Sequence, residues 1–245
     1  MSDAPPPSEG GGTGGPTATA PSAQPETPPA PAVPPPPPPT AAPSPPVPAL
    51  RADSRYPINL DVEVPTRIAR WRPLVQWILA IPLFIVLYVL RIVAVVLAFL
   101  GWFAALFTGQ LPETFGSFIA GYYRYAWRAF SYSWFLRETY PQLGPSLGYE
   151  DPGGDPAWFE VRRGEGLSRL FVLFRIILVI PQAIMVFLLA IALYVAMVVA
   201  FFAVIITGGW PSGLREFVVG ASRWILRVDA WFYLLADPYP PFSLT

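Results

Sequence analysis

The residues with the clearest chemical character are arginines that recur at helical spacing among aromatic side chains. In FGSFIAGYYRYAWRAFSYSWF, Arg124 and Arg128 stand four positions apart, on one stripe of an expected helix. Arg223 and Arg227 repeat this spacing 99 residues later. Guanidinium groups bind phosphate, and Trp and Tyr gather at headgroup level, so the pattern predicts an interfacial helix whose arginines contact the phosphates of anionic lipids.

Two alternatives to this lipid role remain open. The arginines can pair with acids of nearby loops, such as Glu138, Glu160 or Glu165. The aromatic segment can also recross the bilayer, at a cost of a few kcal/mol for each central arginine that lacks a partner.

Other residue types give no sign of catalysis. The chain has no cysteine and no histidine, which removes thiol nucleophiles and the commonest acid/base group at neutral pH. The acids Glu150, Asp151 and Asp155 lie in a Gly/Pro segment whose spacing does not fit a calcium loop. We therefore expect no metal, no cofactor and no enzymatic activity.

Overall composition is typical of a membrane protein. Hydrophobic residues make up 53% of the chain and charged residues only 13%. All 16 basic residues are arginine and are balanced by 16 acids, so bulk charge gives no nucleic-acid signal. The expected partner is the lipid bilayer.

The first 52 residues differ from the rest of the chain. This stretch contains 19 of the 33 prolines and is otherwise rich in Ala, Gly, Ser and Thr. Such a composition buries too little apolar surface to offset its ordering entropy, so residues 1–52 are predicted to form a disordered, Pro-rich tail. The tail is either a solvated spacer or a docking segment for a proline-recognition partner.

An internal repeat organises the remainder. Residues 70–141 match residues 169–240 without a gap at 22 of 72 positions. The informative matches are turn-makers and charges, which a membrane composition does not supply by itself. Break residues shared by the two copies are Thr108, Gly109 and Pro112 in the first and Thr207, Gly208 and Pro211 in the second.

Each copy is predicted to contain a strand, an apolar run and the aromatic helix. Ile58, Leu60 and Val62 alternate with polar residues at the period of a strand, and Phe159 and Val161 take the same places in the second copy. The resulting divisions are a first membrane repeat at 53–143, a Gly/Pro linker at 144–157 and a second membrane repeat at 158–245. The fold class is mainly α and polytopic, with short cytoplasmic strands.

The apolar runs are too long for simple single spans. Residues 176–206 contain 31 residues without a charge, which as one helix measure roughly 46 Å against a hydrocarbon core of about 30 Å. We expect each run to fold back as a hairpin, with Pro82 and Pro181 kinking the first arm. Arg91 then lies at the exposed tip, the alternative being a buried functional charge at mid-membrane.

Arginines flank both ends of each run. The positive-inside rule places all these flanks in the cytoplasm, which two crossings per run allow. The expected location is the inner (plasma) membrane, multi-pass, with a cytoplasmic N-terminus.

The segments YPINLDVEVP, RIARWRPLVQWILAIP, GWFAALFTGQLP and FVVGASRWILRVDAWFYLLADPYPPFSL resemble a bacterial membrane family known as domain of unknown function 4389. The resemblance covers residues 55–245 as two tandem copies. The second copy lacks the Tyr-Pro opening and the Trp before the apolar run. The resemblance implies a membrane protein and no mechanism.

Three function classes follow. The first is a non-enzymatic membrane protein that anchors or scaffolds partners or shapes the bilayer, and it best suits the absence of site chemistry. The second is a subunit of a transporter or channel, for which paired repeats are a precedent. The third, an enzyme acting on lipids, has no nucleophile–base or paired-carboxylate site to support it.

Overall fold

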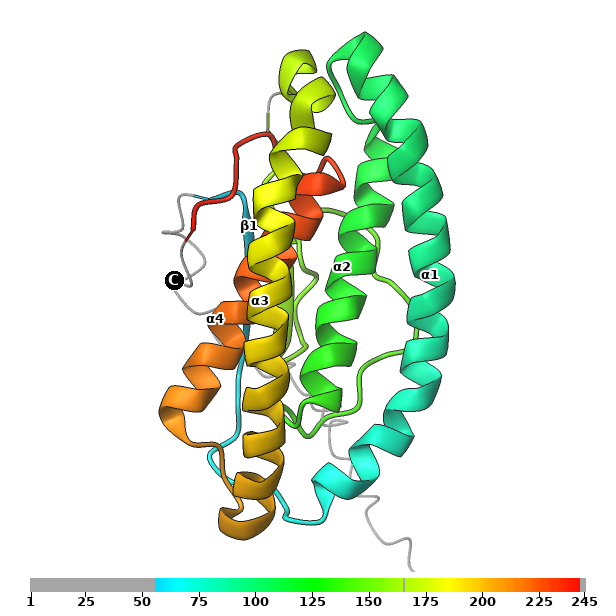
Figure 1. Cartoon of the computed structure of the whole chain (residues 1–245). Helices are drawn as coiled ribbons and strands as arrows, with labels where there is room; N and C mark the ends of the chain where they lie inside the picture. The colour runs from blue at the N-terminus through cyan, green and yellow to red at the C-terminus, as the bar shows by residue number, and fades with distance from the viewer. Residues whose placement is uncertain (1–55, 165, 243–245) are drawn as a thin grey trace, which may run out of the picture. The chain divides into compact units, whose positions relative to one another are not determined.

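The computed structural model describes residues 56–164 and 166–242, and the tail predicted over residues 1–52 lies outside them. All described elements belong to one compact unit, Pro43–Thr245. In chain order (Figure 1) they are β1 (Ile58–Val62), α1 (Arg72–Thr108), α2 (Glu113–Ser133), β2 (Ala157–Val161), α3 (Arg169–Thr207) and α4 (Ser212–Phe232). The chain is mainly helical, with one small antiparallel sheet.

The two repeats are related by an approximate two-fold axis. β1 pairs with β2 in a register that places Leu60 opposite Phe159, and these two residues are themselves repeat equivalents. Ile58 faces Val161 and Val62 faces Ala157, so the register is symmetric about that central pair. The axis therefore passes through the middle of the sheet.

This axis makes the two long helices antiparallel. Trp77, near the start of α1, stacks on Phe201, near the end of α3, with ring centroids 5.2 Å apart. At the other end, Phe103 of α1 and Val172 of α3 line the same cavity. Figure 1 shows the two helices running in opposite directions.

The hairpin prediction is wrong. α1 is one continuous helix of 37 residues and α3 one of 39. The expected tips, at Leu90–Arg91 and Leu189–Ala190, contain no glycine or asparagine that a tight turn would require, and an unbroken helix satisfies its backbone groups internally. Pro82 and Pro181 lie inside these helices, which continue through them. Arg91 consequently lies at the middle of α1 and not at a tip.

The Thr-Gly-x-x-Pro signals end the long helices and also join the repeats. Gly109 takes a left-handed conformation (φ 77°) directly after Thr108, whose hydroxyl donates to the Ala104 carbonyl at 2.7 Å. The Gly109 carbonyl then accepts a 2.8 Å hydrogen bond from the Leu167 N–H, just before α3. At the opposite end, the Ile68 N–H donates to the Gly208 carbonyl at 2.8 Å.

The same signal starts the shorter helices. Pro112 precedes α2 and Pro211 precedes α4, each at the N-cap position. Because proline fixes its own φ and has no N–H, it suits the entry to a helix.

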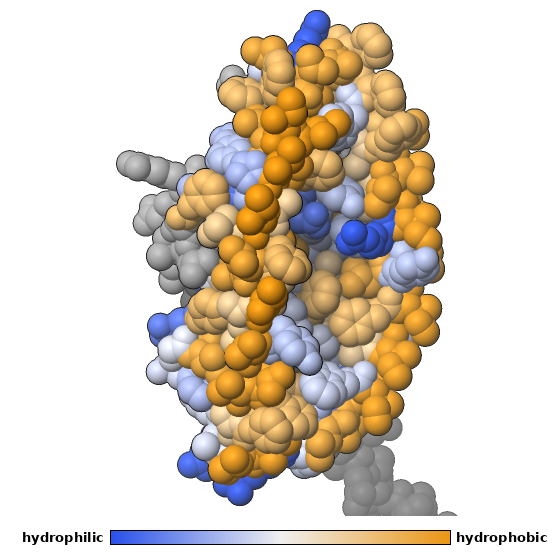
Figure 2. Space-filling model, viewed as in Figure 1, coloured by the Kyte–Doolittle hydropathy of each residue, from blue (hydrophilic) through white to orange (hydrophobic). Residues whose placement is uncertain are grey.

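Most of the exposed large apolar residues in the described part of the chain lie on α1 and α3. Both helices are long and apolar enough to cross a membrane, and only 22% of their most apolar windows is buried. Figure 2 shows this face covered by hydrophobic residues. α2 packs against α1 on one side and β2 on the other, and α4 likewise lies between α3 and β1. The strands are thus separated from the apolar face by the two shorter helices.

A glycine sets how closely the loop 144–156 approaches α2. A Cβ added at Gly121 would stand 2.8 Å from the Ser146 carbonyl oxygen, which is backbone and cannot swing away. We expect Gly121→Ala to lower the free energy of unfolding by about 1–3 kcal/mol, measured by thermal denaturation in detergent. Gly213→Ala is the control, because nothing lies within 4 Å of its added Cβ, and equal effects of the two changes would contradict this packing.

Candidate functional site

The two arginines of α2 are buried in a polar network that fastens a loop and a strand. The Arg124 guanidinium donates to the carbonyls of Phe159 (3.0 Å), Ser146 (2.6 Å) and Glu150 (2.7 Å), among others. The Arg128 Nε donates to the Ala157 carbonyl at 3.2 Å. Burial lowers the pKa of Arg124, and the neighbouring Asp151 opposes that shift.

Two aspartates of the linker complete this network. Asp151 lies 3.4 Å from Arg124 and 3.0 Å from Arg128, and its side chain is 0% exposed. It also accepts the Phe159 N–H at 3.0 Å. Asp155 pairs with Arg128 and with Arg137. The linker acids thus hold β2 against α2.

The arginines of α4 do the same for β1. The Arg223 Nε donates to the Leu60 carbonyl at 3.1 Å, and its guanidinium lies 3.6 Å from Asp61. The Arg227 Nε donates to the Ile58 carbonyl at 3.1 Å. Each strand is therefore held by the arginine pair of one short helix.

These positions correct the lipid-phosphate prediction. Arg124, Arg128 and Arg227 are 0%, 7% and 4% exposed, and Arg223 faces β1, so their guanidiniums are used inside the protein. A desolvated guanidinium has five donors to satisfy, and carbonyls at strand and loop positions satisfy them here. The alternative prediction, that the arginines pair with acids, agrees with the structure. The acids that pair with them are Asp61, Asp151 and Asp155.

We expect Asp151→Asn to destabilise the protein strongly, because it removes the carboxylate that pairs with the buried Arg124 and one of the two that pair with Arg128. The expected loss is about 3 kcal/mol of unfolding free energy, measured by denaturant titration in mild detergent. Glu150→Gln, a matched change at the exposed neighbouring residue, is expected to have little effect. A loss of equal size in both variants would show that the linker charge, rather than the buried pair, matters.

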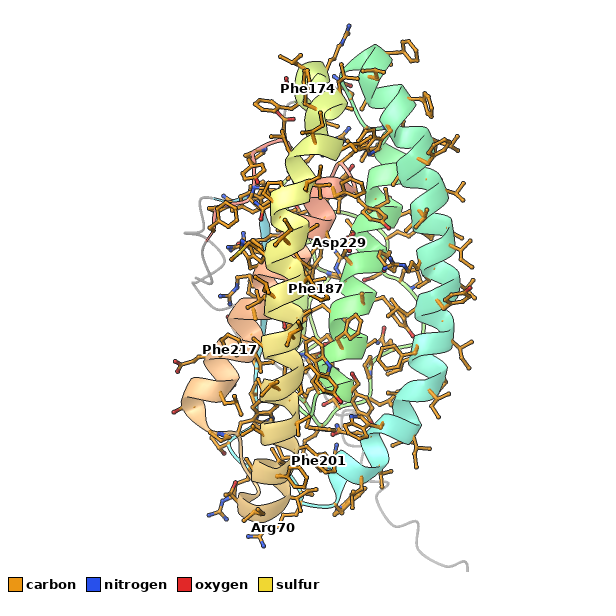
Figure 3. All side chains as sticks on the ribbon, in the orientation of Figure 1. Arg70, Phe174, Phe187, Phe201, Phe217 and Asp229 are labelled. Atoms are coloured by element: carbon orange, nitrogen blue, oxygen red, sulfur yellow. The ribbon has the colours of Figure 1, made fainter. Side chains whose placement is uncertain are left out.

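A second polar cluster lies in the groove between α1 and α3, on the apolar face. It consists of Arg91 from α1, Tyr122 and Tyr123 from α2, Asp229 from α4 and Tyr233 just after α4. The Tyr123 hydroxyl donates to Asp229 Oδ2 at 2.9 Å. Figure 3 places Asp229 between α3 and α2, and Figure 2 shows hydrophilic residues at the centre of the hydrophobic face.

The surroundings of this cluster shift its titratable groups. Burial raises the pKa of Asp229, while the Tyr123 hydrogen bond and the charge of Arg91 oppose that shift. Burial, together with the neighbouring Asp229, also raises the pKa of Tyr123. Tyr123 therefore remains a neutral hydrogen-bond donor at physiological pH.

An apolar cavity of about 450 Å³ adjoins the cluster. It lies between the second half of α1 and the start of α3, and Tyr233 lines it. Val95, one helical turn beyond Arg91, also lines it. The cavity and the charged cluster thus form one continuous site with an apolar part and a polar part.

The residues that form this site differ from their repeat equivalents in the other half of the molecule. The repeat equivalents of Arg91 and Asp229 are Ala190 and Phe130, and those of Tyr122 and Tyr123 are Ala221 and Ser222. At the equivalent of the cavity, Trp77 stands where Ile176 stands and stacks on Phe201. The site is therefore asymmetric within a symmetric framework.

Sequence reasoning missed most of this site. It identified Arg91 but not Asp229, Tyr122 or Tyr123. These three residues belong to the aromatic helices, whose interpretation rested on the arginines. The available signal was a difference between the two copies. A charged residue in one copy aligns with an apolar residue in the other. Among residues 56–164 and 166–242, no group of three acids could hold a metal ion.

The fold and the site define a duplicated protein with two long apolar helices and one asymmetric polar site. The family model described as Domain of unknown function (DUF4389) matches residues 70–143 and 169–243. These regions cover more than half of the chain, which therefore belongs to this family, in two tandem copies. No curated protein and no solved structure matches the chain.

We expect Asp229→Asn to stabilise the protein at neutral pH. The pKa of Asp229 is raised in the folded state. Between the pKa of the unfolded state and that of the folded state, the unfolded protein therefore binds fewer protons. The free energy of unfolding of the wild type falls as pH rises through that window. The neutral amide avoids this loss. Thermal melting from pH 3 to 8 should show a difference that vanishes in acid, below the ordinary aspartate value of 3.8. A constant difference at every pH would contradict it.

Proposed function

We propose that this protein is a non-enzymatic membrane protein that inserts α1 and α3 flat into the cytoplasmic leaflet of the inner membrane. The inserted helices anchor the protein, and their volume in one leaflet bends the bilayer. The Pro-rich segment 1–52 then offers a docking sequence to protein partners on the cytoplasmic side.

The observation that carries this proposal is the position of the sheet relative to the apolar helices. Arg91, at the middle of α1, lies beside Tyr122 of α2. Two residues on, Arg124 donates to the carbonyl of Phe159, at the centre of β2. The sheet is thus level with the middle of α1.

An upright α1 would place that sheet at the centre of the bilayer. Strand edges and charged residues such as Glu160 and Asp61 would then face hydrocarbon, where unsatisfied backbone groups cost several kcal/mol each. With α1 and α3 flat, the sheet faces water and the apolar face meets lipid.

Helix dimensions also favour the flat placement. A helix of 37 residues is about 56 Å long and would need a tilt of roughly 58° to fit a core of about 30 Å. A helix about 10–12 Å wide fits within one leaflet, whose hydrocarbon is about 15 Å thick.

Flanking arginines support the same placement. Arg70 precedes α1 and Arg169 is the first residue of α3, and these starts lie at opposite ends of the antiparallel pair. Single crossings would put the two arginines on opposite sides of the membrane. Flat insertion keeps both on the cytoplasmic side, as the positive-inside rule favours.

The second candidate is a multi-pass transporter or channel subunit. Antiparallel α1 and α3, if they crossed the membrane, would form inverted repeats, and such transporters bind their substrates near the midplane between repeats. Arg91 and Asp229 would then occupy that position. The exposed polar layer beside them would need covering by further copies.

Depth measurements along α1 separate the two candidates. The chain has no cysteine, so single cysteines at Ile78, Val89 and Leu100, which share one face of α1, can carry a spin label in vesicles. All three residues are exposed and span about 33 Å of helix. Flat insertion predicts one depth within a few ångströms for all three labels.

The outcome that would contradict flat insertion is a depth that changes steadily from Ile78 to Leu100, or is greatest at Val89. A label at Glu150 is the control for a water-exposed position in the linker. It should stay accessible to a water-soluble relaxation agent added outside the vesicles in either case.

A further inference from the structure

We propose that the asymmetric groove site binds one phospholipid whose headgroup carries an amine, with its phosphate on Arg91, its ammonium facing Asp229 and an acyl chain in the adjoining cavity. This inference rests on the proposed function, because it needs the apolar face to lie in lipid.

The cavity suits an acyl chain. Its volume of about 450 Å³ lies within the usual range for small-molecule sites, about 300–1,000 Å³. Its lining is formed by aliphatic and aromatic side chains: Val95, Ala98, Phe99, Trp102, Leu173 and Ile176 among them. The cavity lies open between α1 and α3, so a chain can enter sideways from surrounding lipid.

Arg91 suits the phosphate. It is exposed at the middle of the apolar face, hydrogen-bonds the Tyr122 side chain and, among the described residues, forms no ion pair. An arginine in hydrocarbon costs free energy unless it finds a partner. A phosphate accepts hydrogen bonds from two guanidinium nitrogens at once, which makes it a strong partner for this residue.

Asp229 selects for the amine. Its carboxylate accepts one hydrogen bond, from Tyr123, and retains further lone pairs. Arg91 and Asp229 supply one cation and one anion that lie close together but are not paired. Such a site complements a zwitterionic headgroup better than it complements a headgroup with a net negative charge. The site should therefore prefer a phosphoethanolamine headgroup over a phosphoglycerol headgroup.

Both parts of the site differ between the two repeats. In the other half, the uncharged Ala190 and Phe130 take the places of Arg91 and Asp229, and Trp77 takes the place of Ile176 and stacks on Phe201. A cavity left by chance needs no charged pair beside it. The coincidence of cavity, cation and acid on one side of the axis is the pattern of a binding site.

Native mass spectrometry of the full chain tests the proposal. The protein is equilibrated with equal amounts of phosphatidylethanolamine and phosphatidylglycerol of identical chains, then transferred to the gas phase. We expect the wild type to retain one phosphatidylethanolamine. Arg91→Ala, which installs the residue of the other repeat, should retain about tenfold less. Ile176→Trp, which fills the cavity, should also lose the lipid.

Asp229→Asn should bind a phospholipid but lose the preference for the amine. The matched controls are Arg215→Ala and Glu216→Gln at the start of α4, remote in the chain from Asp229, and both should retain the lipid as the wild type does. Unchanged retention by Arg91→Ala, or equal retention of the two lipids by the wild type, would overturn the proposal. So would displacement of the lipid by inorganic phosphate, which would indicate a site for the free ion.

Vesicle flotation separates this proposal from the function on which it rests. Arg91→Ala should float with vesicles as well as the wild type does, because the apolar face is intact. If the wild type fails to float, the membrane placement is wrong. If all variants float and retain phosphatidylethanolamine equally, the placement stands and the lipid site does not.

Discussion

Four guanidinium groups, three of them buried, determine how the layers of this protein are arranged. Because Arg124, Arg128 and Arg227 are desolvated and Arg223 is partly so, each needs acceptors, and the acceptors are mainly carbonyls of the two strands and of the linker. These bonds fix the sheet against one side of α2 and α4. The opposite side of the same helices is left to pack on α1 and α3. One set of polar contacts thereby separates a polar layer from an apolar face.

That separation constrains any contact with a membrane. A helix pair that is apolar around most of its circumference usually indicates a transmembrane span. Here the polar layer is level with the middle of that pair, so the two surfaces cannot both be satisfied by an upright orientation. The two-fold axis has the same consequence, since it sets equivalent arginine flanks at opposite ends of α1 and α3. The two repeats have the same depth and surroundings in a membrane only when the two-fold axis lies along the membrane normal.

The sequence predicted the elements far better than their contacts. The 99-residue offset located both strands, and Gly109 and Gly208 marked the helix ends because a left-handed residue favours glycine. The hairpins were wrong because a long apolar run need not match the thickness of a bilayer, and α1 and α3 continue as single helices. Asp151 was assigned to a linker, and its contact with Arg124 depends on how a Gly/Pro-rich loop folds back onto α2. Spacing along the chain does not encode such a contact.

Duplication gives a protein two equal copies of every surface, so a difference between the copies carries information. Substitution of one apolar residue by another is expected to accumulate in both copies without consequence. Arg91 and Asp229 are different, because charges on an apolar face reduce stability unless something compensates. Arg91 and Asp229 come from separate repeats and lie beside a cavity lined by Ile176, where the other copy has Trp77, so the two copies differ at three distant positions in the chain. Stability alone would favour their loss, and a bound ligand accounts for their presence.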